Sequence, residues 1–148
     1  MHELKSIIKE DIRIALRASD KAKLGVLRLV TAAIKQVEVD ERRELTDDDV
    51  LSVLERMLKQ RRESLDHYRK ANRSDLADQE SYEIGVIKCY MPEPLSTVEI
   101  TSLIKQTIDD IGASSLRDMG KVMATLKAQI KGRADMRDVS NEVKSRLQ

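Results

Sequence analysis

Basic side chains interleaved with very small ones are the most informative chemical feature of this 148-residue sequence. Between residues 116 and 137 there are six Lys and Arg residues and only two acidic ones. In a helix, Gly120, Ala124 and Ala128 share one face, and apolar residues share the opposite one. The same face carries Arg117, Lys121, Lys127 and Lys131. A row of small residues edged by cations allows close approach by a nucleic acid backbone or by another helix. The same pattern is also compatible with an ordinary solvated face.

A tight turn follows this segment, in the string Lys131-Gly132-Arg133-Ala134-Asp135. A glycine after a helix, flanked by lysine and followed by an aspartate cap, is explained by helix-end chemistry alone. Alternatively, the two basic residues flank a turn beside a helix start, which can seat a phosphate. Arg137 and Lys144 share a face of the next helix and extend the patch. We therefore predict a nucleic-acid-binding surface made of Arg117, Gly120, Lys121, Lys127, Lys131, Gly132, Arg133, Arg137 and Lys144.

No arrangement of residues is typical of catalysis, of a metal site or of a cofactor site. The two histidines, His2 and His67, and the one cysteine have no metal-ligand spacing. Cys89 lies among apolar residues, which favours a buried thiol over a nucleophile. The glycine-rich phosphate-binding motifs are absent, and Ser114-Ser115 is interpreted as a helix cap. We expect no catalytic residue, no metal and no cofactor.

One basic residue falls within an apolar stripe. Arg61 lies between Met57 and Leu65 on the core side of its helix, whereas Lys59 and Arg62 belong to a solvated face. A guanidinium there either extends to solvent or pairs with a carboxylate, and an ion pair with a helix neighbour is the favoured interpretation.

Composition predicts a helical protein with an aliphatic core. Hydrophobic residues make up 41% and charged residues 36% of the chain, with no Phe, no Trp and three Tyr. Few rings are therefore available to stack unpaired bases. The net charge is +1, so overall attraction to a polyanion is weak. A single cysteine, no apolar leader and no membrane-length apolar run predict a cytosolic protein without membrane contact.

Helical periodicity predicts an all-α fold of about four helices followed by three shorter ones. The expected helix caps are Ser19 or Asp20, Thr46, Ser74, Ser96, Ser114 or Ser115, and Asp135. Thr46 precedes three aspartates, a strong helix start, and Ser96 with Glu99 predicts a capping box. Gly112 should end the fifth helix, and the sixth should end near Gly132.

Both prolines of the chain lie in the string Met91-Pro92-Glu93-Pro94, which no helix can cross. We predict a proline hinge between an amino-terminal helical domain, residues 1–91, and a three-helix tail domain, residues 96–148. The tail has a thin core and should depend partly on docking or a partner.

Four strings resemble the YqeY family. They are Lys59-Gln60-Arg61-x-Glu63-Ser64, Tyr90-Met91-Pro92-Glu93-Pro94-Leu95-Ser96, Asp118-Met119-Gly120-Lys121-Val122-Met123 and Lys131-Gly132-Arg133-Ala134-Asp135. The resemblance implies a helical amino-terminal part and a three-helix tail of the kind found in the B subunit of glutamine-dependent aspartyl/glutamyl-tRNA amidotransferase, where that tail helps recognise tRNA. It also implies that Gly120, Lys121, Lys131 and Arg133 face RNA.

Three functions stay open at this stage. The leading hypothesis is an accessory module that binds tRNA or another structured RNA. The second is a protein-interaction module that receives a partner helix on the Gly120/Ala124/Ala128 row. The third follows the family label, a carbon–nitrogen ligase with glutamine as amido donor, although the chain lacks the domains for that chemistry. We expect no enzyme in this chain by itself.

Overall fold

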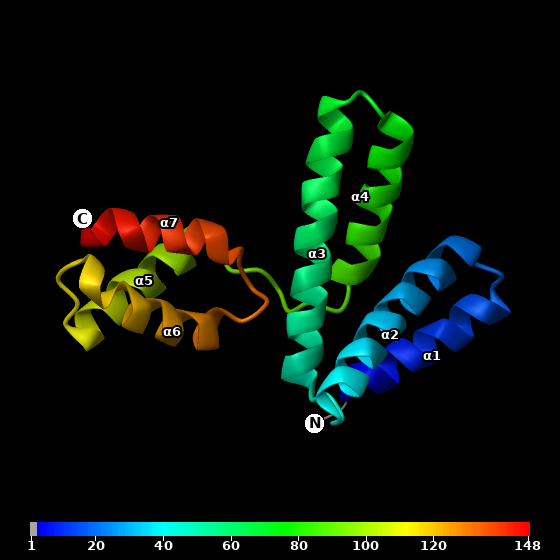
Figure 1. Ribbon diagram of the computed structural model, residues 1–148, viewed down its shortest axis with the longest axis horizontal. Helices are drawn as coiled ribbons and strands as arrows, with labels where there is room; N and C mark the ends of the chain where they lie inside the picture. The colour runs from blue at the N-terminus through cyan, green and yellow to red at the C-terminus, as the bar shows by residue number, and fades with distance from the viewer. Residues whose placement is uncertain (1–2) are drawn as a thin grey trace. The chain divides into compact units, whose positions relative to one another are not determined.

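The computed structural model describes residues 3–148, which form seven α-helices and one 3-10 turn and contain no strand (Figure 1). The predicted all-α fold is confirmed. The elements are α1 (Glu3–Arg17), α2 (Lys21–Glu41), α3 (Asp47–Lys70), α4 (Ser74–Lys88), α5 (Thr97–Ile111), η1 (Leu116–Asp118), α6 (Met119–Ile130) and α7 (Met136–Leu147). The chain divides into two compact units, Met1–Met91 and Pro92–Gln148.

The first unit consists of two helical hairpins, α1–α2 and α3–α4, the second of which is the more extensive (Figure 1). Their core is aliphatic apart from one tyrosine, as the lack of Phe and Trp requires. Its buried residues are Ile8, Val26, Leu27, Val30, Ile34, Leu45, Val50, Val53, Leu54, Met57, Leu58, Ile84, Ile87 and Tyr90.

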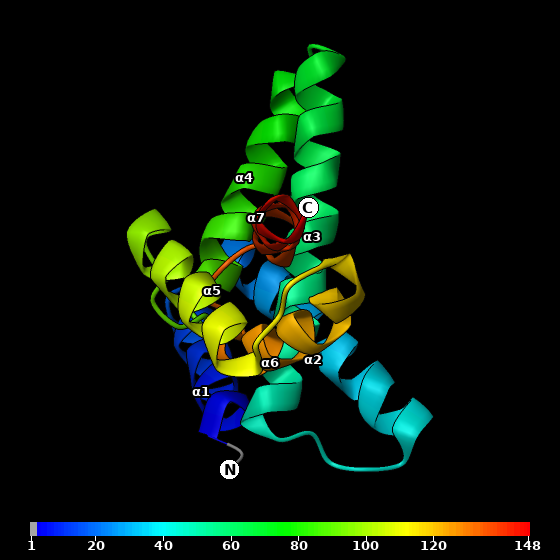
Figure 2. The ribbon, with the colours of Figure 1, turned by 90° about the vertical axis from the view of Figure 1, so that its left-hand side faces the viewer.

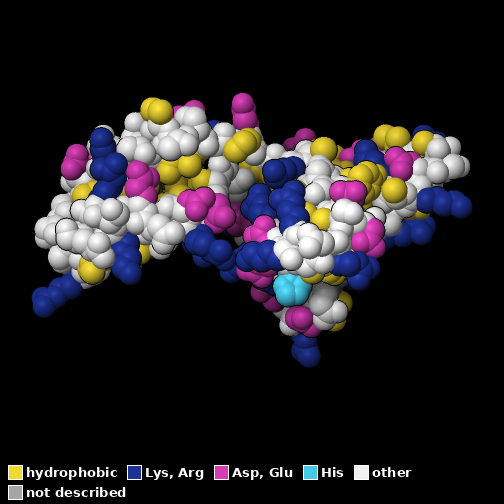
Figure 3. Space-filling model, turned by 90° about the horizontal axis from the view of Figure 1, so that it is seen from above, with side chains coloured by type: hydrophobic (Ala, Val, Ile, Leu, Met, Phe, Trp, Pro, Cys, Tyr) yellow, Lys and Arg dark blue, Asp and Glu magenta, His cyan; other side chains and the backbone are white. Residues whose placement is uncertain are grey.

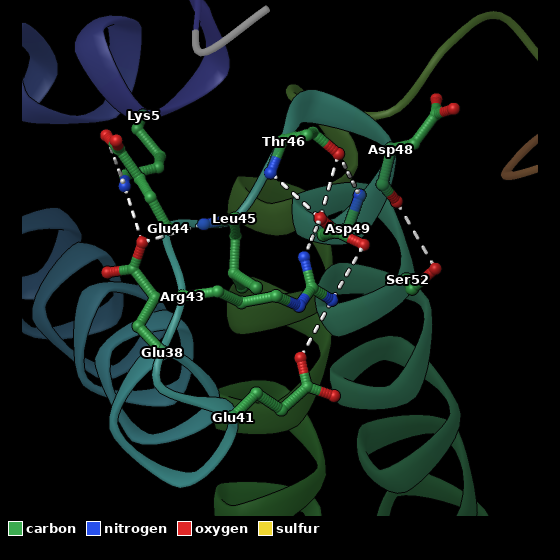
Figure 4. Close-up of polar contacts among 10 residues, drawn as sticks. All are labelled: Lys5, Glu38, Glu41, Arg43, Glu44, Leu45, Thr46, Asp48, Asp49 and Ser52. Atoms are coloured by element: carbon green, nitrogen blue, oxygen red, sulfur yellow. Dashed lines mark hydrogen bonds and ion pairs between the residues drawn. The ribbon is translucent and has the colours of Figure 1, made fainter.

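Polar contacts fix the start of α3 (Figure 4). The amide of Asp49 donates to the Thr46 hydroxyl at 3.3 Å, and the amide of Thr46 donates to the Asp49 carboxylate at 2.9 Å, so the strong helix start is confirmed. The Arg43 guanidinium donates to the same carboxylate at 2.7 Å. This guanidinium, with the Thr46 contacts, holds the pKa of Asp49 far below its usual range.

A buried phenol ties the end of α4 to α1. The Tyr90 hydroxyl donates to the Asp11 carboxylate at 2.5 Å. Burial, reinforced by this carboxylate, raises the pKa of Tyr90 well above its usual value, so the phenol stays protonated and remains a donor.

Arg61 crosses between the helices of the second hairpin. Its guanidinium lies 3.6 Å from the carboxylate of Glu83 on α4 and donates to the Met57 carbonyl at 3.4 Å. Both side chains of the pair are largely buried, with 15% and 12% exposed. The expected carboxylate partner is thus present, but it comes from the packed helix and not from α3 itself.

One cap prediction is wrong, and another is only half right. The amino-terminal cap of α4 is Arg73, which makes no side-chain cap, and Ser74 is already the first helical residue. At the start of α5 the Ser96 hydroxyl accepts from the Glu99 amide at 3.1 Å, as expected. The Glu99 carboxylate, however, accepts from the Ser96 hydroxyl rather than from its amide, so the contact is only half of a capping box.

The second unit packs α5, α6 and α7 around seven buried residues, and Figure 2 views α7 almost end-on. These residues are Ile104, Val122, Leu126, Ile130, Val139, Val143 and Leu147. Gly112, at a φ of 72°, ends α5 as predicted, and the Asp135 carboxylate caps α7 by accepting from the Arg137 amide.

Candidate nucleic-acid interface

One side of α6 packs into the core of the second unit, which leaves the other side in solvent. Val122, Leu126 and Ile130 are fully buried. Gly120, Ala124 and Ala128, here named the small-residue strip, are exposed. A Cβ added at Gly120 would meet no atom within 4 Å. The strip is therefore open to a partner.

Cations border the strip on both sides. Helical spacing puts Lys127 on one flank and Lys121 on the other, and both side chains are exposed. No acidic residue occurs within α6. The nearest carboxylate in sequence, Asp118, has its pKa lowered by the Ser114 and Ser115 amides and, to a smaller degree, by Lys121. Elsewhere acidic and basic side chains are interspersed, as one face of the molecule shows (Figure 3).

Arg117 is exposed but lies outside α6, contrary to the prediction of one continuous sixth helix. Ser115 and Asp118 form a capping box around a 3-10 turn, and α6 begins only at Met119. Because a 3-10 turn advances by about three residues per turn, the 100° spacing does not extend to Arg117.

Arg133 has a structural role that the sequence did not indicate. Its side chain donates to the Glu93 carbonyl at 2.9 Å, and its own carbonyl accepts from the Leu95 amide at 2.8 Å. Gly132, at a φ of 74°, permits the turn that presents it. Lys131 and Arg133 are both half-buried. The turn therefore fastens the segment before α5, and the Nε–H of its arginine is engaged in that contact.

The predicted residues of α7 are on its solvent side. Val139 and Val143 are buried, whereas Arg137 and Lys144 are exposed. The nine predicted residues thus separate into η1 (Arg117), α6 (Gly120, Lys121 and Lys127), the turn (Lys131, Gly132 and Arg133) and α7 (Arg137 and Lys144), and of these Lys121 and Lys127 flank the strip within α6.

Among residues 3–148, no three His, Cys, Asp or Glu side chains lie close enough to hold a metal, and His2 lies outside the described residues. His67 packs edge-on against Tyr68 beside a hollow of about 410 Å³. Cys89 is exposed and donates to the Gly85 carbonyl at 3.3 Å, so the expectation of a buried thiol is wrong.

No helix in the described part of the chain is long and apolar enough to cross a membrane. A family model described as Yqey-like protein matches residues 5–147, nearly the whole chain. The chain belongs to the YqeY family. The family resemblance of the four strings is thereby confirmed.

Curated fungal proteins of this family are similar over much of their length. The Altered inheritance of mitochondria protein 41, mitochondrial, of Pyrenophora tritici-repentis (strain Pt-1C-BFP) is 29% identical over 92% of this chain and 76% of its own. The protein of the same name from Saccharomyces cerevisiae (strain YJM789) is 26% identical over 95% of this chain and 75% of its own. The one from Eremothecium gossypii is 34% identical over 62% of this chain and 51% of its own.

The expected cytosolic location is contradicted by these relatives, because their names place them in mitochondria. The prediction rested on a single cysteine and on an amino terminus without an apolar run. A reducing interior and the lack of a secretory leader do not distinguish the cytosol from a mitochondrial compartment.

Proposed function

We propose that this YqeY-family protein is an accessory module that binds tRNA or another structured RNA through the small-residue strip of α6. The observation that carries the proposal is the exposure of Gly120, Ala124 and Ala128 between two exposed lysines on a helix without carboxylates. No bulky side chain would hold the sugar–phosphate backbone away from α6.

Binding would depend on charge and shape. Lys121 and Lys127 would neutralise phosphates on either side of the strip, and Arg117, Arg137 and Lys144 would add contacts at its ends. The presence of only three tyrosines, with no Phe and no Trp, supports backbone recognition over stacking of splayed bases. Gly132 and Arg133 would shape the turn rather than contact RNA.

Direct binding to purified tRNA at low salt tests the proposal. The variant Lys121→Glu/Lys127→Glu reverses both flanking charges and should weaken binding more than tenfold, because each lost phosphate contact removes part of the counterion-release term. The matched control is Lys59→Glu/Lys70→Glu, which makes the same charge change on exposed lysines of α3 and should alter affinity far less.

A second variant separates shape from charge. Ala124→Leu keeps every charge but fills the strip, so it should weaken RNA binding while leaving the fold intact. No detectable tRNA affinity at low salt would contradict the proposal. A stoichiometric protein partner, bound through the strip and free of RNA, would replace it with the protein-interaction hypothesis.

A further inference from the structure

A groove of about 650 Å³ lies in the first unit, between α1, α2 and the link to α3. Ile8 and Ile34, both buried, form its apolar floor, and Val39 stands beside them with 59% of its surface exposed. The lining on α2 runs from Thr31 to Val39, a length of about 12 Å at helical rise, and continues to Arg42 just after the helix. This volume is within the range of about 300–1,000 Å³ for small-molecule sites.

Cations without neutralising partners line the groove. Lys9 and Arg42 have no ion-pair partner anywhere in residues 3–148, and both are exposed. Lys35 also lines it and forms no ion pair with a carboxylate of residues 3–148, although its charge helps to lower the pKa of Glu38.

The acidic residues of the groove are already engaged (Figure 4). The Lys5 ammonium lies 2.6 Å from the Glu38 carboxylate and 3.3 Å from that of Glu44. The Leu45 amide also donates to Glu38, at 2.9 Å. Lys5 and the Leu45 amide together lower the pKa of Glu38, so this carboxylate stays ionised and paired. An anion that enters the groove would therefore contact Lys9 and Arg42, which have no ion-pair partner in residues 3–148.

We propose that this groove binds a single-chain amphiphile with an anionic headgroup. The alkyl chain would lie over the floor of Ile8 and Ile34 and against Val39, whose exposed apolar surface would be removed from water at a gain of roughly 25 cal/mol per Å². The headgroup would pair with Lys9, Lys35 and Arg42. The site is independent of the RNA surface, because all its residues belong to the first unit.

Calorimetric titration with dodecyl phosphate, kept below its micelle concentration, tests this assignment. The unmodified protein should bind it, whereas inorganic phosphate and the uncharged dodecanol should each bind at least tenfold more weakly. Lys9→Glu/Lys35→Glu and, separately, Val39→Asp should each weaken dodecyl phosphate binding at least tenfold. Both changes are at exposed positions, and circular dichroism checks that the helices remain.

Two controls make the result specific to the groove. The variants Lys59→Glu/Lys70→Glu on α3 and Lys121→Glu/Lys127→Glu on α6 should bind dodecyl phosphate as the unmodified protein does. The inference is overturned if the unmodified protein does not bind, if inorganic phosphate binds as tightly as the amphiphile, or if both groove variants retain full affinity. RNA binding by the groove variants distinguishes failure of this inference from failure of the proposed function.

Discussion

The α1–α2 groove and the α6 strip both combine cations with an uncharged centre, but they differ in where the carboxylates are. In the groove Glu38 and Glu44 are held by Lys5, and Lys9 and Arg42, without an ion-pair partner in residues 3–148, lie beside an apolar floor. On α6 there is no carboxylate, and the centre consists of glycine and alanine. The two proposals therefore assign a groove to a mixed apolar–anionic ligand and an exposed helix face to a polyanion, within one chain of net charge +1.

The cores that support these two surfaces differ in size. Fourteen buried hydrophobic residues hold the first unit together, and seven hold the second. The second unit should therefore have the smaller margin of stability, and changes there should have the more visible consequences.

The largest expected effect comes from the smaller core. Leu126→Ala removes a fully buried side chain of α6 and should destabilise the protein by about 2–5 kcal/mol. Hydrogen exchange should show the amides of the second unit losing protection, while Leu54→Ala, of similar cost, leaves those of the first unit measurably protected. If the α6 amides kept full protection in Leu126→Ala, the core of seven buried residues would not be what limits the stability of the second unit.

Next in size is loss of the turn contact in the same unit. Arg133→Ala removes the hydrogen bond to the Glu93 carbonyl, which is open to solvent, and should cost about 0.5–1.5 kcal/mol of unfolding free energy, measured in urea. Lys127→Ala, an exposed residue without such a contact, is the control and should be near neutral. If Arg133 serves only to bind phosphate, Arg133→Ala should instead have the same unfolding free energy as the unmodified protein.

A smaller effect on stability is expected when the pH is lowered, through the paired Glu38 of the first unit. The pKa of Glu38 is lower in the folded state than its ordinary 4.5, so its pairing stabilises the fold above that pH and is lost as pH falls through the folded pKa. Glu38→Gln should cost about 1 kcal/mol at pH 7 and less at pH 3. Glu10→Gln, in an exposed pair with Arg13, should change stability little at either pH. An equal loss from Glu38→Gln at both pH values would contradict this linkage.

The smallest effect is expected from replacing one helical glycine in each unit. Gly120 on α6 and Gly25 on α2 are both helical, with open space where a Cβ would be. Gly120→Ala and Gly25→Ala should each stabilise the protein by about 0.5–1 kcal/mol in thermal unfolding. Destabilisation by Gly120→Ala alone would mean that the strip is packed against another part of the protein.

Periodicity and cap chemistry were sufficient to predict most of the fold. Thr46, Asp135 and Gly112 act at helix ends as predicted, because a cap depends on residues three or four positions away. The exposure of the strip also follows from local helical spacing, since Val122, Leu126 and Ile130 determine which side is buried.

Contacts between distant segments were not predictable from the sequence. The Arg133 side chain donates a hydrogen bond to the Glu93 carbonyl, forty residues away, and Arg61 pairs with Glu83 on another helix. The groove likewise depends on Lys5 meeting Glu38 across two helices, which no local pattern indicates. The residues that neighbour Arg133, Arg61 and Lys5 in the sequence do not indicate whether each cation is solvated or is bound by a distant partner.

The salt dependence of tRNA binding tests the central claim most directly. For the unmodified protein, the logarithm of the binding constant should fall linearly with the logarithm of salt concentration, with a slope of about 0.9 per phosphate contacted. Replacing Lys121 and Lys127 with glutamine should reduce that slope by about two contacts, and the Lys59→Gln/Lys70→Gln control should leave it unchanged. A slope that is the same in all three proteins would contradict binding through the α6 strip.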